Sequence, residues 1–396
     1  MKRLLSFIKR NIIKLFFVIA EQIVPKDNNI IVFGGPQGNR YADNCRYLFE
    51  YFVTKTEFDC YWLTINNNLT QLINKTDYQK KIRTPYSFKS LCIFLKAKTV
   101  IVAYSRTDIP VYYICPKRKT IINLWHGIPL KRLGLLDKKI QISKKRRSHL
   151  KNESYSRFIA SSEIEGYIHA LAFGISYEHI WVTGMPRNDV LFQEVDFDLK
   201  QIIVKDSKAK LILYAPTFRD GDRHTEFFPF TDRDFQKLVT FLTEQNSYIL
   251  VRAHANEKDR LADLVEAQQG LRDRIIFVGQ DYFPDVNDIL PIIDILLTDY
   301  SGIYFDFLLL DRPIIFIPYD FQQYVNDRGG FTVDYFRYTA GPKIYTQNEL
   351  IRHLAEYLDN PSKDAQLREN IRNLFHYYQD GKARERIYKK ISELNK

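Results

Sequence analysis

Two histidines stand where an apolar run gives way to a polar loop, a place suited to a proton acceptor. His126 follows the apolar residues 120–125 and precedes a Gly-Pro turn, so its ring is expected to be exposed. His254 follows the run 248–252, directly after Arg252 and Ala253. Histidine is the usual general base near neutral pH, because its ordinary pKa lies at about 6.5. A hydrogen-bonded loop histidine without a catalytic role is also common, so the residues alone leave both roles open.

Hydroxyl, carboxylate and guanidinium groups follow two further apolar runs. Thr217 and Arg219 come after residues 210–215, and Thr298, Asp299 and Ser301 come at and after the end of residues 292–298. A turn that leads from a strand into a helix offers free backbone N–H groups to an anion. Arginine matches the geometry of phosphate with a planar fork of donors. These positions predict a phosphate-binding edge, although Asp299 or Ser301 would also serve as a simple helix N-cap.

Metal binding is not expected. Asp220 and Asp222 have the Asp-x-Asp spacing of metal-dependent sugar transferases, but they lie in a polar loop where a solvated turn is favoured. The four cysteines stand singly, without the paired spacing of a zinc site, and are expected to be reduced core thiols.

The elements that must position these side chains have the pattern of parallel sheets covered by helices. Short β-rich runs alternate with longer helical stretches in both halves of the 396 residues. Ligands bind at the carboxyl ends of strands in such sheets. The expected strands are 29–33, 61–64, 99–103, 120–125 and 157–160 in the first half, and 210–215, 248–252, 274–278, 292–298 and 313–317 in the second.

This pattern predicts an α/β fold with two Rossmann-like, doubly wound domains that face a central cleft. The expected division is an N-terminal helix (1–26), an acceptor-side domain (27–195) and a donor-binding domain (196–396). The last helices, 347–358 and 363–395, are expected to pack back across one or both domains. No internal repeat or low-complexity tract interrupts this organisation.

The positive charge is concentrated in two segments. The net charge is +11, which favours an anionic partner. Residues 2–24 have the periodicity of an amphipathic helix, and Lys14 and Glu21 interrupt the apolar run, so neither a cleavable signal nor a membrane-spanning helix is expected. Such a helix either lies in a bilayer interface, which the charge favours, or packs on its own domain. The predicted membrane-contacting cations are Lys2, Arg3, Lys9, Arg10, Lys14, Lys144, Lys145, Arg146 and Arg147.

Seven motifs, in order along the chain, resemble those of the CDP-glycerol glycerophosphotransferase family, the teichoic acid primases and polymerases with the GT-B fold. They lie at residues 125–131, 184–189, 214–220, 298–301, 305–307, 312–316 and 328–331. The family commonly has a second serine where Gly302 stands, and often a proline where Ala255 stands. Neither departure removes a titrating group.

The resemblance implies transfer of glycerol phosphate or ribitol phosphate from a CDP-polyol to a hydroxyl of a lipid-linked teichoic acid or capsule precursor, with release of CMP. It implies that His126 is the general base and that Arg219, Arg252 and His254 hold the diphosphate beside Ser301. It implies no metal and no cofactor beyond the donor. Supporting roles are expected for Lys131, Arg187, Asp189, Asp306 and Arg328. A peripheral position on the cytoplasmic face of the membrane is expected.

Two other functions remain open at this level. One is a nucleotide-sugar glycosyltransferase of the same fold, because sheet pattern does not separate the two reactions. The other is a non-catalytic membrane-binding protein, which would leave the strand-end motifs unexplained. A nucleic-acid partner is not expected, since no known nucleic-acid module is recognisable. The motifs do not specify the polyol, the acceptor, the number of units added or the oligomeric state.

Overall fold

The computed structural model describes residues 2–72, 78, 81–142, 155–194, 197–217, 219, 225–253, 257, 263, 270–280 and 282–395. The chain divides into two compact units. Unit 1 contains residues 1–126, 142–189 and 382–396, and unit 2 contains residues 127–141 and 190–381. The sequence places the domain boundary at residue 195 and assigns 127–141 to the first domain. The structure instead assigns 127–141 to unit 2, because this segment pairs with the loop around Phe331.

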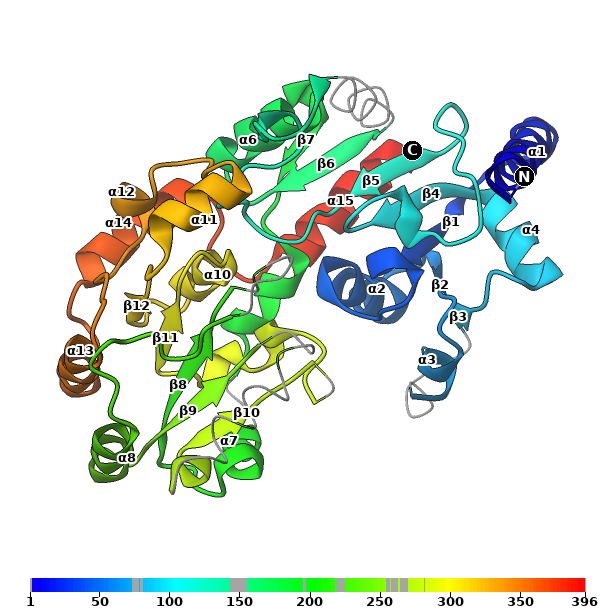
Figure 1. The fold of residues 1–396 in the computed structure, drawn as a ribbon. Coiled ribbons are helices and arrows are strands. Elements are labelled where there is room, and N and C mark those ends of the chain that lie inside the picture. The colour runs from blue at the N-terminus through cyan, green and yellow to red at the C-terminus, as the bar shows by residue number, and fades with distance from the viewer. Residues whose placement is uncertain are drawn as a thin grey trace. The chain divides into compact units, whose positions relative to one another are not determined.

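Unit 1 is built on a parallel seven-stranded sheet among the described residues (Figure 1). Its strand order is β3-β2-β1-β4-β5-β6-β7, the order of a doubly wound Rossmann-like sheet. The strands consist largely of β-branched and aromatic residues, as expected where both faces are buried. They are β1 (Asp27–Gly34), β2 (Asp59–Leu63), β3 (Ile82–Arg83), β4 (Ala97–Val102), β5 (Thr120–Asn123), β6 (Arg157–Ala160) and β7 (Ile180–Val182).

Helices from both ends of the chain complete unit 1. Its hydrophobic core joins residues of the sheet, such as Trp62, to Phe49 of α2 and to Ile387 and Ile391 of α15. The segment 363–395, which was expected to be helical throughout, is therefore divided between the units. Its final part, α15, packs in unit 1, and its earlier part belongs to unit 2. The helices of unit 1 are α1 (Lys2–Ile23), α2 (Asp43–Lys55), α3 (Asn67–Leu72), α4 (Phe88–Lys96), α6 (Glu163–Phe173) and α15 (Ala383–Asn395).

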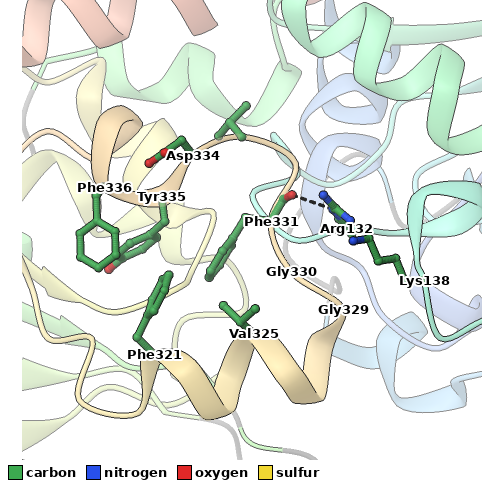
Figure 2. A pocket seen from close by; sticks show the side chains of 11 residues that line it. Arg132, Lys138, Phe321, Val325, Gly329, Gly330, Phe331, Asp334, Tyr335 and Phe336 are labelled. Atoms are coloured by element: carbon green, nitrogen blue, oxygen red, sulfur yellow. Dashed lines mark hydrogen bonds between the residues drawn. The ribbon is translucent and has the colours of Figure 1, made fainter.

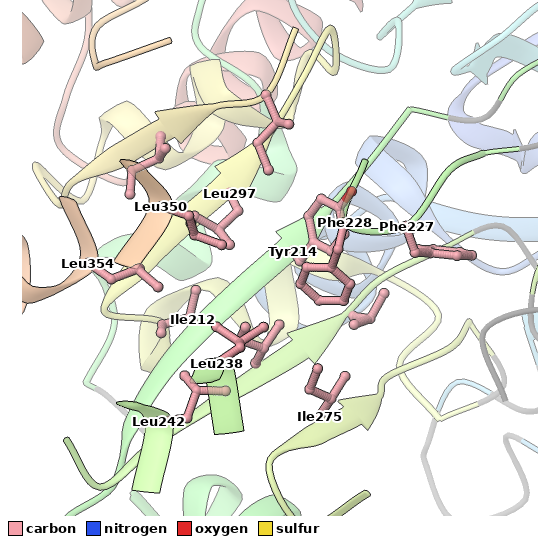
Figure 3. Packing of buried hydrophobic residues seen from close by; sticks show 14 of the residues in the cluster. Ile212, Tyr214, Phe227, Phe228, Leu238, Leu242, Ile275, Leu297, Leu350 and Leu354 are labelled. Carbon is pink, nitrogen blue, oxygen red and sulfur yellow. The ribbon is translucent and has the colours of Figure 1, made fainter. Parts of the chain in front are cut away.

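Unit 2 has a parallel five-stranded sheet among its described residues, in the order β10-β9-β8-β11-β12. The core on this sheet brings Ile212, Tyr214 and Leu297 against Leu238, Leu350 and Leu354 of the covering helices (Figure 3). The strands are β8 (Lys210–Ala215), β9 (Ser247–Val251), β10 (Ile275–Phe277), β11 (Ile295–Thr298) and β12 (Ile314–Phe316). The helices are α7 (Phe197–Val204), α8 (Phe235–Glu244), α10 (Ile303–Leu308), α11 (Phe321–Arg328), α12 (Tyr335–Tyr338), α13 (Gln347–Asp359) and α14 (Ala365–Phe375).

Helix α1 is attached to unit 1 by one buried side. Phe17 packs edge-on against Phe94 of α4 at 5.8 Å. Glu21 is fully buried and forms ion pairs with Lys26 and with the buried Lys119, the latter at 3.2 Å. A buried ion pair is costly to break, since removal of one partner leaves a buried charge unpaired. This side of α1 is therefore part of the fold of unit 1.

The opposite side of α1 is apolar and exposed. Ile12, Leu15, Ile19 and Ile23 are 63%, 59%, 52% and 74% exposed. Lys14 is exposed too, with its Nζ 5.3 Å from the centre of the Tyr113 ring. The side chains of Lys2, Arg3, Lys9 and Arg10 lie outside the described ones, as do residues 144–147. Of the helices that the structure describes, none is long and apolar enough to cross a membrane.

Candidate active site

His126 lies just beyond the end of β5, between two aromatic rings. The Tyr104 ring stacks on the imidazole at 4.0 Å with an interplanar angle of 4°. The ring of Trp125 lies 4.0 Å from the same imidazole. The expectation of an exposed ring is wrong, because these neighbours leave His126 only partly accessible. Burial lowers the pKa of His126 to about 4, against the opposing effect of the Asp43 charge. The imidazole is therefore neutral at pH 7 and able to accept a proton.

Asp43 links the surroundings of His126 at the start of α2. Its carboxylate accepts hydrogen bonds from the Tyr104 hydroxyl at 3.2 Å and from Arg187 Nη1 at 3.1 Å. The same Nη1 donates to the carbonyl oxygen of His126 at 2.8 Å. Asp43 has a φ of 64°, an unusual conformation for a residue other than glycine. Strained residues of this kind persist where the surroundings hold them, often at functional sites. One carboxylate thus positions both the stacking ring and the backbone of His126.

Asn44 connects the same three segments through its amide. Its Nδ2 donates to the carbonyl oxygen of Trp125 at 2.9 Å, and its Oδ1 accepts from the backbone N–H of Arg187 at 3.0 Å. The sequence predicted a supporting role for Arg187 but missed Asp43, Asn44 and Tyr104. An acid and an amide just before an apolar run were the available signal, although helix capping alone explains such residues. Their contact with the loop around Trp125 was not visible in the sequence.

Asp189 has a structural position near the C-terminus of the chain. Its carboxylate accepts hydrogen bonds from the backbone N–H groups of Ala383 at 2.9 Å and Arg384 at 3.0 Å, and from Arg384 Nε at 2.8 Å. Burial raises the pKa of Asp189, and these hydrogen bonds oppose that rise. Asp189 therefore secures the start of α15 rather than joining the group around His126.

Arg219 follows β8 and is buried between two carboxylates. Its Nε and Nη2 donate to both oxygens of Asp320 at 2.9 Å, and Nη2 also lies 3.0 Å from Asp299 Oδ2. Its Nη1 donates to the carbonyl oxygen of Thr217 at 2.5 Å. Burial alone would lower the pKa of Arg219, but Asp299 and Asp320 outweigh this effect and raise it. The guanidinium nitrogens thus bind groups of the protein itself. This arrangement does not support the predicted direct contact between Arg219 and a phosphate group.

Other predicted phosphate ligands at these strand ends also have partners within the protein. The Thr298 hydroxyl is buried and donates to the carbonyl oxygen of Ala215 at 2.8 Å. Arg252 Nη1 donates to the carbonyl oxygens of Val278 and Gly279 at 3.1 and 3.0 Å. Asp299 accepts from the Thr217 backbone N–H at 2.8 Å. The structure brings Thr217, Arg219, Thr298 and Asp299 together, but most of their polar groups bind one another.

Ser301 is the exposed member of this edge. It is partly exposed just before α10, and its Oγ lies 3.4 Å from the Ile303 backbone nitrogen. The Thr217 hydroxyl is buried without a hydrogen bond to any described residue. His254, Asp220 and Asp222 lie outside the described residues. In the part of the chain that is described, no three His, Cys, Asp or Glu side chains gather as a metal-ligand set.

The remaining predicted residues lie in unit 2. Asp306 is buried in α10. The Lys131 Nζ lies 5.5 Å from the centre of the Tyr324 ring, and Arg328 is the last residue of α11, before Gly329 with a φ of 75°. Lys131 pairs through its backbone with Phe331. The guanidinium of Arg219 lies 4.9 Å from the centre of the same Tyr324 ring, so Lys131 and the Arg219 group meet at this side chain.

A family model described as CDP-Glycerol:Poly(glycerophosphate) glycerophosphotransferase matches residues 16–393. The chain belongs to this family. Family members are transferases, so the chain is assigned to the transferases.

Curated relatives resemble the chain over most of its length. The teichoic acid ribitol-phosphate polymerase TarK of Staphylococcus aureus is 27% identical, over 98% of this chain and 73% of the relative. The teichoic acid glycerol-phosphate transferase of the same organism is 28% identical, over 92% of this chain and 93% of the relative. A teichoic acid poly(ribitol-phosphate) polymerase of Bacillus spizizenii is 26% identical, over 93% of this chain but only 57% of the relative.

Solved structures support the fold. The wall teichoic acid polymerase TagF matches with a TM-score of 0.77 and 25% identity, over 95% of this chain and 90% of that one. A structure of a TagF variant soaked with CDPG matches with a TM-score of 0.75. The predicted fold, two Rossmann-like units of the GT-B type, is confirmed by the two sheet orders and by this likeness.

Proposed function

We propose that this protein transfers glycerol phosphate or ribitol phosphate from a CDP-polyol to a hydroxyl group of a lipid-linked teichoic acid or capsule precursor. The observation that carries the proposal is His126, a neutral histidine held at the end of β5 by Tyr104, Asp43 and Arg187, in a chain that belongs to a glycerophosphotransferase family. The names of the relatives include both glycerol-phosphate and ribitol-phosphate enzymes. Either polyol is therefore a candidate donor.

The proposed step needs one base and one leaving group. The acceptor oxygen attacks the phosphorus that carries the polyol, and the bond from that phosphorus to the oxygen of CMP breaks. The acceptor proton passes to the imidazole of His126, and CMP leaves with the bonding electron pair. Positioning and charge neutralisation provide most of the catalysis in phosphoryl transfer. Burial lowers the pKa of His126 to about 4, so the imidazole is unprotonated at neutral pH but is a weaker base than an exposed histidine. The Asp43 charge opposes this loss of basicity.

Asp43 acts in this proposal as a positioning residue. It orients the ring that stacks on His126 and the arginine that holds the His126 carbonyl oxygen. Its negative charge also raises the pKa of His126 and so opposes the effect of burial. A base held by its backbone and by a stacked ring keeps its orientation, which supports the alignment that such a step requires.

In unit 2, the proposed donor site uses Ser301, Arg252 and His254 for the diphosphate. The contacts of Arg219 favour an indirect role, in which it holds Asp299 and Asp320 and so shapes the loop after β8. Asp299 in turn binds the backbone of Thr217. Thr298 is proposed to secure the same loop through Ala215.

Product analysis tests the function directly. The purified full-length protein is given CDP-glycerol, CDP-ribitol or a UDP-sugar in turn, with a synthetic lipid-linked acceptor, and the product is examined by mass spectrometry. The expected result is acceptor extended by polyol phosphate and release of CMP in equal amount. Transfer from a UDP-sugar with none from either CDP-polyol would refute the proposal in favour of a glycosyltransferase.

We also propose that α1 holds the protein on an anionic membrane at the cytoplasmic face. The support is its exposed face, where Ile12, Leu15, Ile19 and Ile23 carry apolar side chains into solvent. An interfacial helix buries such a face at the boundary between headgroups and acyl chains. Deletion of residues 1–24 would remove Glu21 and leave the buried Lys119 without its carboxylate partner. Point substitutions on the exposed face are therefore the sharper test.

The Ile12→Glu and Ile19→Glu double variant should float less with vesicles that contain anionic lipid than the wild type does. The matched control is the Asn11→Glu and Gln22→Glu double variant, which adds the same two negative charges at exposed polar positions of α1. Equal flotation of the double variant and the control would refute the membrane proposal. Added salt should weaken only the electrostatic part of binding.

A further inference from the structure

Unit 2 contains a pocket of about 360 Å³ that none of the roles proposed above uses. Two segments far apart in the sequence line it, residues 132–138 and residues 321–336 (Figure 2). Its volume lies within the range of small-molecule sites, about 300–1,000 Å³. Of the motifs that carry the family resemblance, 125–131 directly precedes the first segment and 328–331 lies within the second.

One wall of the pocket is cationic. Arg132 and Lys138 line it, and within the described part of the chain neither forms an ion pair with a carboxylate. Two hydrogen bonds hold Arg132 in place. Its Nε donates to the carbonyl oxygen of Phe331 at 3.0 Å, and its backbone N–H donates to the carbonyl oxygen of Gly330 at 3.1 Å. Arginine binds phosphate with charge-assisted hydrogen bonds from its planar fork. This wall is therefore suited to an anionic group.

The other wall is aromatic. The rings of Phe321 and Phe331 stack at 5.8 Å with an interplanar angle of 17°, and Phe336 lies 4.8 Å from Phe321. Phe336 is 50% exposed. Apolar side chains with a few convergent polar groups are the usual lining of a ligand site. Figure 2 shows the ring of Phe331 between the cationic side, with Arg132, and the side where Asp334 lies.

The two walls are joined by backbone pairing, so the pocket is formed without a ligand. The backbone N–H of Thr332 donates to the carbonyl oxygen of Leu130 at 2.9 Å, and its hydroxyl donates to the carbonyl oxygen of Pro129 at 2.6 Å. Gly329 has a φ of 75°, and a Cβ there would lie 3.1 Å from the carboxylate of Asp137. The glycine thus permits the close approach of the two segments. A preformed site loses less conformational entropy when a ligand binds than a site that must become ordered on binding.

Asp334 gives the pocket a hydrogen-bond acceptor as well. It lines the pocket and is exposed, and its Oδ1 already accepts the Arg337 N–H at 3.0 Å. A carboxylate accepts hydrogen bonds from hydroxyl groups. The lining therefore combines cations for phosphate, flat rings for an apolar face and an acceptor for hydroxyls.

We propose that this pocket binds the acceptor substrate through a phosphate group and the hydroxylated residue attached to it. That residue is either a polyol, as in a polyol-phosphate chain, or a sugar, as in a glycosyl phosphate. The assignment to the acceptor rests on the proposed function. It also rests on the lining, which shares no residue with the loops after β9 and β11 where the donor phosphates are proposed to bind. The pocket lies next to the loop after β11, because the hydroxyl of Tyr335 donates to the carbonyl oxygen of Asp299 at 2.9 Å. The pocket makes Arg132 and Lys138 acceptor-binding residues.

Binding of three soluble probes to the full-length protein tests the proposal by calorimetry. The probes are a glycerol-phosphate trimer, N-acetylglucosamine 1-phosphate and CMP. We expect the wild type to bind one of the first two and Arg132→Ala to weaken that binding at least about tenfold. Lys138→Ala should act in the same direction, and it should leave the fold intact because the Lys138 side chain is exposed. The matched control, Arg337→Ala, removes an exposed arginine of α12 that does not line the pocket and should change nothing.

The possible results distinguish failure of the pocket proposal from failure of the proposed function. Unchanged affinity for the phosphate probes in both variants overturns the proposal, as does failure of the wild type to bind either one. An equal loss of CMP affinity overturns the assignment to the acceptor and moves the pocket to the donor. In transfer assays, Arg132→Ala should raise the KM for the acceptor and leave the KM for the CDP-polyol unchanged. A wild type that accepts no CDP-polyol refutes the proposed function, whereas probe binding is measured without turnover.

Discussion

The surroundings of His126 and those of Arg219 both follow a parallel strand, yet they are stabilised in opposite ways. His126 is held by a stacked ring and by a hydrogen bond to its carbonyl oxygen, and it forms no ion pair within the described residues. Arg219 is held by its own functional group, since Asp320 and Asp299 occupy its guanidinium. The imidazole therefore stays available for chemistry, whereas the guanidinium is used to build the loop. Position at a strand end alone does not separate these two cases.

The largest expected effect on turnover belongs to His126→Ala. A histidine base contributes about 10²- to 10⁴-fold, so CMP release should fall by that factor. Donor binding should stay near that of the wild type, because no donor contact is assigned to His126. The melting temperature should fall somewhat, because the ring contacts with Tyr104 and Trp125 are lost. Turnover close to that of the wild type would remove His126 from the mechanism.

Arg219→Ala should act first on stability. The substitution leaves Asp299 and Asp320 without their cation, and breaking a buried pair costs about 3–5 kcal/mol. Chemical denaturation should show this loss in the free energy of unfolding. Arg219→Lys, which keeps the charge but not the fork, should recover part of it. A stable Arg219→Ala protein with weak CDP-glycerol binding would instead assign Arg219 to the phosphates.

Asp43→Asn should lower kcat without loss of donor affinity. It removes the ion pair to Arg187, and a misplacement of the base of about 1 Å can cost up to about 10²-fold. Asp43→Glu keeps the charge and should retain more activity than the amide does. Equal kcat in the wild type and Asp43→Asn would show that the carboxylate does not position His126.

The smallest effect concerns pH. Because the pKa of His126 is lowered to about 4 from its ordinary 6.5, kcat/KM should fall only as the pH drops toward about 4. Asp43→Asn should move this acidic limb still lower, since the Asp43 charge raises that pKa. An acidic limb at the ordinary value would contradict the buried environment of the base.

Periodicity and strand-end position predicted most of the fold. The expected strands 157–160 and 210–215 match β6 and β8 at both ends, because each is a short apolar run with clear limits. The sequence missed β3, Ile82–Arg83, and β7, Ile180–Val182, which are too short for alternation to be visible. The pattern predicted one helical segment over 363–395, whereas α14 ends at Phe375 and α15 begins at Ala383. The assignment of 127–141 to unit 2 depends on tertiary pairing with Phe331, which no local pattern reveals.

The candidate site was predicted less completely than the fold. The motifs located His126 and Arg219, but not the residues that decide what each can do. Tyr104 and Asp320 lie at a distance in the sequence from the groups they contact, and neither belongs to the motifs that carry the family resemblance. Exposure was also misjudged for His126, because the stacking of Tyr104 was not visible. Side-chain partners across a sheet edge require the packed structure.

The contribution of α15 to unit 1 has a consequence for biosynthesis. Ile387 and Ile391 complete the core on the first sheet, and Asp189 binds the start of α15. Domains usually fold in order as the chain leaves the ribosome. Here unit 1 combines residues 1–126 with residues 382–396, so its core cannot be completed before α15 has left the ribosome. A ribosome that stops short of α15 would release a chain in which unit 1 lacks part of its core, although most of that unit has already been made.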